Sequence, residues 1–139
     1  PDEYLDNLSY QNRESIWNQA IPRGGVYVAE VDGKVVGFAN GGKERSGNYA
    51  GYDGELYAIY ILEEYQGQGI GKKLLTAVAN HLVNQGYSNM LVIVLEDNPA
   101  KYFYESTGAI YVATDDLEIS GKKLKELVYG WEDLERVVS

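Results

Sequence analysis

Three glycines, Gly67, Gly69 and Gly71, lie two residues apart immediately before a run of strong helix formers. Glycine in a helix costs about 1 kcal/mol relative to alanine, so three of them at the start of a helix need a reason. The first N–H groups of a helix have no partner within it and carry roughly half a positive charge, and glycines let an anion approach them closely. The segment therefore predicts either a phosphate-binding loop or a tight strand-to-helix turn.

Two common phosphate-binding motifs do not fit this segment. A dinucleotide fingerprint needs its third glycine where Lys72 stands. A P-loop needs glycine at the position of Gln66 and serine or threonine at the position of Lys73. The pattern that is present is Gln66-x-x-Gly69-x-Gly71 with two lysines behind it.

Hydrophobic periodicity predicts one α/β domain over the 139 residues, with helices against a mixed sheet. A first helix is expected after an N-cap at Ser9 and before a stop at Pro22, with a face formed by Tyr10, Arg13, Trp17 and Ala20. Strands are expected over residues 26–31, 34–42, 55–62, 89–95, 109–119 and 122–132, with turns at Asp32-Gly33 and Ser120-Gly121. Two more helices are expected over 69–85 and 99–107, ended by Gly86 and Gly108.

The composition restricts the partners more than the fold. Acidic residues outnumber basic ones by 21 to 12, for a net charge of -9, so no nucleic-acid partner is expected. The same charge attracts a cationic substrate such as an amine, or merely aids solubility. The absence of cysteine excludes disulfides, thiolate metal sites and a cysteine nucleophile, and it agrees with a cytoplasmic location. No apolar run approaches the ~20 residues that span a bilayer, so no membrane association is expected.

The glycine pattern resembles the acetyl-CoA pyrophosphate loop of the GNAT superfamily of N-acetyltransferases. A later segment, EDNPAKYFYESTGA over residues 96–109, is similar to the family's Asn-x-Ala-x-x-Phe-Tyr-Glu-x-x-Gly signature. The resemblance covers about residues 26–131, although Glu63 replaces a frequent proline before the loop. It implies a mixed, mostly antiparallel sheet flanked by helices, with a gap between two splayed central strands that holds the pantetheine arm of acetyl-CoA.

The resemblance also implies which residues bind acetyl-CoA. Backbone groups of Ile59, Tyr60 and Ile61 are expected to bind the pantetheine amides, although Ile59 and Ile61 also suit plain core packing. Asn98 matches a position that commonly contacts the cofactor. The pyrophosphate is expected to lie against the amides of Gln66, Gly67, Gln68, Gly69, Ile70, Gly71 and Lys72.

Acetyl transfer to an amine needs a base and an acid, and the resemblance suggests both. Tyr104 aligns with the tyrosine that lies near the cofactor sulfur, and a phenol can protonate a departing thiolate; the alternative is a core tyrosine, one of 13. Glu55 matches the glutamate base of histone-type members, against the alternatives of a solvent-exposed strand end or a water chain as base. The acceptor side is expected at Tyr49, Tyr52 and Asp53.

Other catalytic devices are not expected. A ping-pong route through an acetylated thiol needs a cysteine, so direct attack in a ternary complex remains. His81, the sole histidine, falls in the middle of a predicted helix and is not expected to be catalytic. No cluster of histidine and acidic residues has metal-ligand spacing, so no metal is expected.

Two functions remain open, an N-acetyltransferase acting on a primary amine and a non-catalytic acyl-CoA-binding sensor or regulatory module. The acceptor, a small molecule or a protein amine, is not determined. The last hairpin suits a homodimer in either case. Family members normally begin with a strand and a helix ahead of the segment that starts at Pro1, so we expect these elements to be absent. The strand that starts at Val26 would then be an edge of the sheet.

Overall fold

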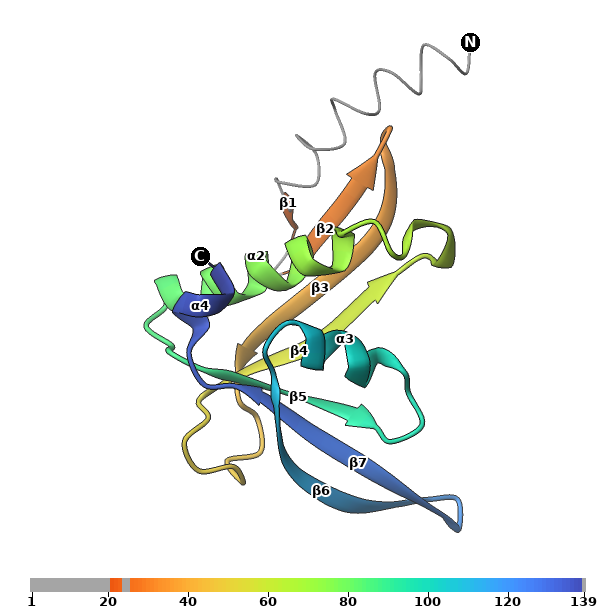
Figure 1. The fold of residues 1–139 in the computed structure, drawn as a ribbon, viewed down its shortest axis with the longest axis vertical. Helices are drawn as coiled ribbons and strands as arrows, with labels where there is room; N and C mark the ends of the chain where they lie inside the picture. Colours follow the sequence, from red (N-terminus) through yellow and green to blue (C-terminus); the bar gives the residue numbers. More distant parts are fainter. Residues whose placement is uncertain (1–20, 24–25, 139) are drawn as a thin grey trace. The chain divides into compact units, whose positions relative to one another are not determined.

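The computed structural model describes residues 21–23 and 26–138. The predicted first helix, with Ser9 as its N-cap and Tyr10, Arg13, Trp17 and Ala20 on one face, lies outside the described residues. The described elements are β1 (Ile21–Arg23), β2 (Val26–Val31), β3 (Lys34–Lys43), β4 (Gly54–Ile61), η1 (Glu63–Tyr65), α2 (Ile70–Asn84), β5 (Met90–Leu95), α3 (Ala100–Ser106), β6 (Ile110–Ile119), β7 (Lys122–Trp131) and α4 (Leu134–Val138) (Figure 1).

The described residues form two compact units, of which the first holds residues 21–23, 26–40 and 58–78 and the second holds residues 41–57 and 79–138. The elements β3, β4 and α2 each contribute residues to both units. Hydrogen bonds join the strands in the order β1-β2-β3-β4-β5-β7-β6. The pairing is antiparallel for β1–β2, β2–β3, β5–β7 and β6–β7, and parallel for β4–β5. This is the mixed, mostly antiparallel sheet that the sequence predicts.

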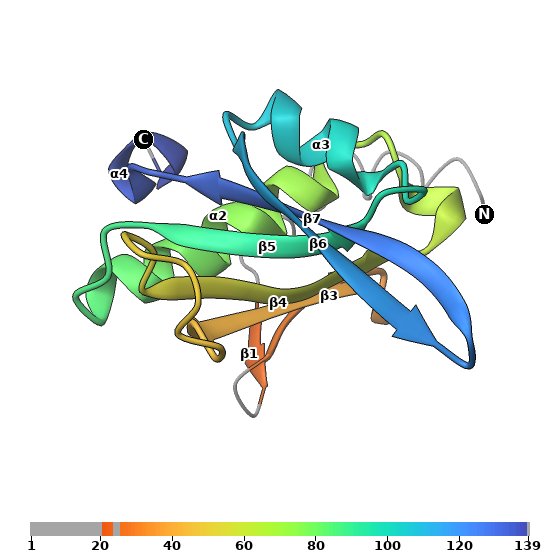
Figure 2. The same ribbon diagram turned by 90° about the horizontal axis from the view of Figure 1, so that it is seen from below.

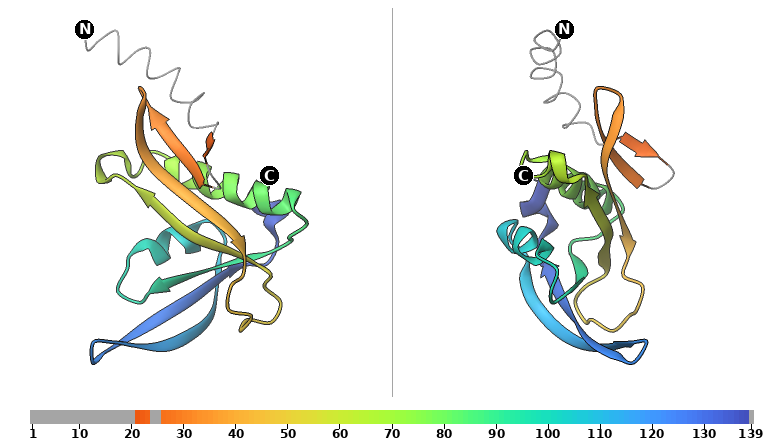
Figure 3. Two further views of the ribbon diagram at one scale, coloured as in Figure 1. Left: turned by 180° about the vertical axis from the view of Figure 1, so that it is seen from behind. Right: turned by 90° about the vertical axis from the view of Figure 1, so that its right-hand side faces the viewer.

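In the first unit, β2 and β3 form the predicted hairpin. Asp32 and Gly33 both have positive φ, 53° and 80°, as a two-residue turn between twisted strands requires. The prediction that β2 is an edge strand is wrong, because β1 pairs with it through Ile21 and Val28 (Figure 3). Pro22, expected from the sequence as a helix stop, lies in β1 opposite Tyr27. Proline is compatible with an edge strand, where its missing N–H costs no ladder hydrogen bond.

In the second unit, β7 pairs with β5 on one side and with β6 on the other (Figure 2). The turn between β6 and β7 again has two positive φ values, 51° at Ser120 and 78° at Gly121, which confirms the predicted hairpin. Residues 126–131 of β7 pair with β5, and the Lys125 carbonyl accepts a hydrogen bond from the Glu96 N–H just after β5. Residues 122–124 pair with β6, so the hairpin extends past β5 (Figure 1). Within the second unit, β4 and β5 pair in parallel through Glu55 and Leu91.

Helix α2 matches its prediction to within a residue at each end. Its first intrahelical bond runs from the Lys73 N–H to the Gly69 carbonyl at 3.2 Å. At its C-terminus Gly86 has φ +93°, and the Tyr87 N–H donates to the Leu82 carbonyl at 2.9 Å, which together form a Schellman motif. Among the described residues, no helix is both long and apolar enough to cross a membrane.

The buried face of α2 packs against strands at two glycines. In the first unit, Leu74 lies 3.3 Å from where a Cβ of Gly37 would stand, and in the second unit Leu82 lies 3.2 Å from the corresponding point at Gly54. Both leucines are 0–1% exposed. Side chains at these glycines would separate helix from strand, so close packing explains them better than turn geometry does.

Candidate active site

The glycine loop lies in the first unit, between η1 and α2. Gly67 and Gly69 have φ values of +75° and +85°, which L side chains rarely adopt. A Cβ built at either position meets nothing within 4 Å, so the loop faces open space rather than a packed neighbour. The first amides of α2 point out of the helix without intrahelical acceptors. The loop therefore fits an anion such as a pyrophosphate.

Side chains of the loop brace it instead of covering the amides. The Gln66 Nε2 donates to the Ile61 carbonyl at 3.0 Å, and the Gln68 Nε2 donates to the Glu64 carbonyl at 3.2 Å. Ile70 is 1% exposed and anchors the start of α2 in the core, and the Lys72 side chain is exposed. The Gln66 N–H already donates to the Glu63 carbonyl at 3.2 Å. Of the predicted pyrophosphate contacts, the backbone N–H groups that follow Gln66 are therefore the available ones.

The predicted pantetheine residues lie at the end of β4 in the same unit. Ile59 and Ile61 are half-buried, and Tyr60 is 53% exposed, with its ring centroid 5.9 Å from that of Phe38. A Cβ at Gly37 would stand 2.9 Å from the Tyr60 carbonyl oxygen, so this glycine permits a close approach of the two strands. The sequence signals a strand at Gly37 and carries no sign of this role.

In the second unit, Glu55 is a buried carboxylate held by one residue. It is 3% exposed. The backbone N–H of Arg45 donates to its Oε1 at 3.1 Å, and the Arg45 Nη2 donates to its Oε2, also at 3.1 Å. The alternative of a solvent-exposed strand end is therefore wrong. Sequence reasoning missed Arg45, because the pair depends on how the ends of β3 and β4 meet.

A second buried carboxylate, Glu44, adjoins Arg45. It accepts hydrogen bonds from the Ser46 N–H at 2.9 Å, the Ser46 hydroxyl at 2.7 Å and the Gly47 N–H at 2.6 Å. Burial by itself raises the pKa of Glu44, but these hydrogen bonds outweigh it and leave the pKa below its ordinary value. Glu44 thus shapes the loop after β3.

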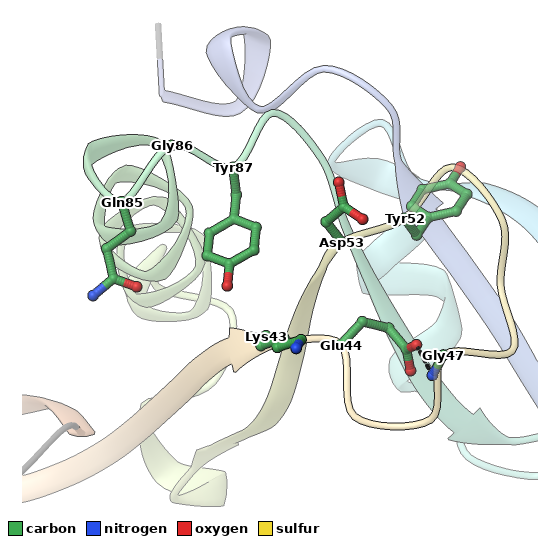
Figure 4. Close-up of a pocket in the computed structure, with 8 residues that line it drawn as sticks. All are labelled: Lys43, Glu44, Gly47, Tyr52, Asp53, Gln85, Gly86 and Tyr87. Atoms are coloured by element: carbon green, nitrogen blue, oxygen red, sulfur yellow. Dashed lines mark hydrogen bonds between the residues drawn. The ribbon is translucent and has the colours of Figure 1, made fainter.

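Two of the three predicted acceptor-side residues line one cavity of the second unit, with a volume of about 340 Å³. Figure 4 shows the Asp53 carboxylate and the Lys43 ammonium at this cavity. Tyr52 packs its ring against Gly130, where a Cβ would stand 2.5 Å from it. The full lining consists of Lys43, Glu44, Gly47, Tyr52, Asp53, Gln85, Gly86 and Tyr87.

Tyr49, the third predicted acceptor-side residue, does not line this cavity. Its hydroxyl donates a hydrogen bond to the Asp115 carboxylate of β6, 66 residues away in the sequence. Burial, the bond to Asp115 and further acidic groups raise the pKa of Tyr49 to about 12. Tyr49 therefore ties the loop between β3 and β4 to the β6–β7 hairpin.

Tyr104 lies on α3 in the second unit and is 5% exposed. Its ring meets that of Trp131 edge to face, with centroids 5.8 Å apart and an interplanar angle of 85°. Within residues 21–23 and 26–138 its hydroxyl has no hydrogen-bond partner, and burial raises its pKa. A buried hydroxyl that remains protonated and unpaired is available as a proton donor.

Asn98 and the question of a metal site remain from the sequence predictions. The Asn98 side chain is exposed, and its Oδ1 accepts a hydrogen bond from the Ala100 N–H at 2.9 Å, so it supports the start of α3. In the part of the chain that the structure describes, no three histidine or acidic side chains form a group able to hold a metal.

Comparison with known proteins identifies the family. Residues 1–109 match the model of the acetyltransferase (GNAT) family. The chain belongs to this family, and it is an N-acetyltransferase, as the sequence resemblance implied. A relative from Bacillus subtilis (strain 168), named uncharacterized N-acetyltransferase YuaI, is 47% identical over 135 residues, which is 96% of this chain and 77% of the relative.

Solved structures agree on the fold. An N-acetyltransferase from Staphylococcus aureus Mu50 aligns with a TM-score of 0.64 at 22% identity, over 96% of this chain and 76% of that one. The yncA protein of Salmonella typhimurium, a putative acetyltransferase solved with its cofactor acetyl-CoA, aligns with a TM-score of 0.63 at 23% identity, over 93% of this chain and 72% of that one. The predicted GNAT-like α/β fold is thereby confirmed.

Proposed function

We propose that this enzyme transfers the acetyl group of acetyl-CoA to a primary amine by direct attack in a ternary complex. The observation that carries the proposal is the glycine loop, in which Gly67 and Gly69 hold positive φ beside open space at the start of α2. The yncA neighbour was solved with acetyl-CoA, and the family uses this co-substrate. The sequence has no cysteine to carry an acetyl group between two half-reactions.

Acetyl-CoA supplies a thioester whose carbonyl carbon is attacked, and the protein supplies the contacts that orient it. Backbone amides over residues 67–72 are proposed to bind the pyrophosphate, with the helix dipole adding to the attraction. Backbone groups of Ile59, Tyr60 and Ile61 are proposed to bind the pantetheine arm, and Asn98 is proposed as a further contact.

Two side chains of the second unit are proposed to move protons. A lysine-like amine with a pKa of about 10.4 is neutral in only roughly one part in two thousand at pH 7, so a proton must leave it. Glu55, a buried carboxylate, is the proposed acceptor of that proton, either directly or through water. The Tyr104 hydroxyl is the proposed donor to the departing thiolate, because it is buried and carries a raised pKa.

The amine is proposed to enter on the side of Tyr52 and Asp53. Their cavity has room for a small cationic group, and the Asp53 carboxylate is exposed there. The net charge of -9 supports attraction of a cation. Small polyamines, aminoglycoside-like amines and protein amines all remain candidates, and a homodimer remains a proposal that light scattering would test.

An amine-dependent assay of thiol release tests the proposal. The purified chain is incubated with acetyl-CoA alone and then with a panel of cationic and neutral primary amines, and free CoA thiol is followed with time. We expect thiol release that requires an amine and forms the acetylated amine in equal amount. Acetyl-CoA binding without release for any amine would contradict the transferase mechanism and favour the non-catalytic binding module.

A further inference from the structure

The contacts of Glu55 single out Arg45 as its partner. Arg45 binds both carboxylate oxygens, one through its backbone N–H and one through Nη2, each at 3.1 Å. The Glu55 side chain is 4% exposed and that of Arg45 is 65% exposed, so the guanidinium comes to the carboxylate from the solvent side. A buried carboxylate is costly without such a partner. The two bonds use two of its roughly four lone-pair sites and leave the others for a substrate.

Arg45 is itself held in place by Tyr57. The guanidinium carbon lies 4.2 Å from the centroid of the Tyr57 ring, within the range of a cation–π interaction. The Tyr57 hydroxyl donates to the Lys43 carbonyl at 2.6 Å. The ring occupies the space over Gly42, where a Cβ would stand 2.8 Å from the hydroxyl oxygen.

These contacts form a series from Gly42 through Tyr57 and Arg45 to Glu55, all in the second unit. Each member limits the freedom of the next, so the orientation of the carboxylate is set before a substrate arrives. Such preorganisation matters in catalysis, because a misplacement of about 1 Å can cost about 10²-fold in rate.

We propose that Arg45 is a positioning residue of the acetyl transfer, which fixes the Glu55 carboxylate so that its free lone pairs receive the proton of the acceptor amine. This inference rests on the proposed role of Glu55 as the base. A purely structural ion pair would also bury Glu55, but its loss would alter stability and leave turnover of the folded enzyme unchanged.

The test measures kcat and KM for Arg45→Met and Arg45→Lys with the best amine of the panel. Arg45→Met is expected to lower kcat by about 10- to 100-fold with an unchanged KM for acetyl-CoA. Both variants retain the backbone N–H bond to Oε1. Arg45→Lys also retains a cation, so it is expected to recover part of the loss. The control is Lys125→Met, which removes an exposed cation 3.4 Å from Asp116 in the same unit and is expected to change neither constant.

A second variant reaches Glu55 indirectly and remains informative if Arg45→Met does not fold. Gly42→Ala displaces the Tyr57 ring and thereby loosens Arg45, without touching either member of the ion pair. We expect a lower kcat with an unchanged KM for acetyl-CoA. The inference is overturned if Arg45→Met and Gly42→Ala both keep the kcat of the parent enzyme.

Glu55→Gln separates failure of this inference from failure of the proposed base. A kcat that falls in Glu55→Gln but is unchanged in the folded Arg45 variants would overturn the positioning role alone. An unchanged kcat in Glu55→Gln would overturn both, because no base would then be positioned. A fall in all three, with partial recovery in Arg45→Lys, supports the series of contacts.

Discussion

Gly69→Ala tests the glycine loop, and Gly33→Ala is its matched control. The two glycines belong to the same unit, have φ values of +85° and +80°, and each has open space where a Cβ would stand. Alanine in the left-handed region costs about 1–2 kcal/mol, reduced somewhat because alanine also restricts the unfolded chain. Both variants are therefore expected to lose about 1 kcal/mol of unfolding free energy.

Only Gly69→Ala is expected to lose acetyl-CoA binding, because its methyl group points into the space that the pyrophosphate needs. Acetyl-CoA at 100 times its Kd adds about 2.7 kcal/mol to the folded state. For a chain of this size we take roughly 3–5 °C in Tm per kcal/mol, so the parent and Gly33→Ala should gain roughly 10 °C. A 100-fold weaker Kd at the same concentration leaves about 0.4 kcal/mol, or roughly 2 °C, for Gly69→Ala.

Thermal unfolding of the three proteins, with and without acetyl-CoA, measures both effects together. Equal gains in Tm for Gly69→Ala and Gly33→Ala would refute the loop as a pyrophosphate site and leave the glycines as a tight turn. Loss of the gain in both variants would refute the assignment to this loop, because Gly33 lies in the turn between β2 and β3.

Three further predictions concern the second unit. Tyr104→Phe removes the proposed proton donor and should lower kcat about 10²-fold or more. It should not lower the unfolding midpoint, since the buried hydroxyl has no partner among the described residues. Steady-state kinetics that show less than about a threefold change in kcat would contradict this role. In the structure the Trp131 Nε1 donates to the Thr107 hydroxyl at 3.0 Å. Thr107→Val removes this acceptor while the indole N–H stays buried, so it should lower the unfolding free energy measured in urea by about 1–3 kcal/mol. The folded-state pKa of Glu44 is lowered from its ordinary value of 4.5. Its contribution to stability is therefore present above pH 4.5 and is lost as the pH falls through the folded-state pKa. In Glu44→Gln the unfolding free energy should fall less steeply with decreasing pH than in the parent.

Local signals account for the elements that the sequence predicts correctly. Helix α2 begins after Gly69 and ends before Gly86. Both boundaries can be predicted, because the flanking glycines and the helical spacing of the apolar residues are local features of the sequence. The hairpin turns at Asp32-Gly33 and Ser120-Gly121 follow from backbone conformations that few other residue pairs adopt. Three short elements have no counterpart in the sequence predictions, β1 (Ile21–Arg23), η1 (Glu63–Tyr65) and α4 (Leu134–Val138), since three to five residues carry too little pattern to stand out.

The contacts around the candidate site depend on residues far apart in the chain. Tyr49 bonds Asp115 across 66 residues, and the Tyr52 ring requires the absence of a side chain at Gly130. Neither contact has a local signature, because each arises only when the loop between β3 and β4 meets the β6–β7 hairpin. The sequence marked both tyrosines as acceptor-side residues, whereas the structure places only Tyr52 at the cavity.

The sequence by itself determined the glycine loop and, through two short motifs that resemble the GNAT family, the family itself. The candidate base Glu55 and the candidate acid Tyr104 followed from that resemblance. Only the tertiary structure decided how those residues are held. In the sequence, Glu55 is a polar residue at the expected start of a strand. In the structure it is a buried carboxylate that accepts two hydrogen bonds from Arg45, which follows β3. The physical reason is that burial and ion pairing are properties of chain segments brought together by folding. Arg45 and Glu55 are ten positions apart in the sequence, so no local pattern shows that they meet.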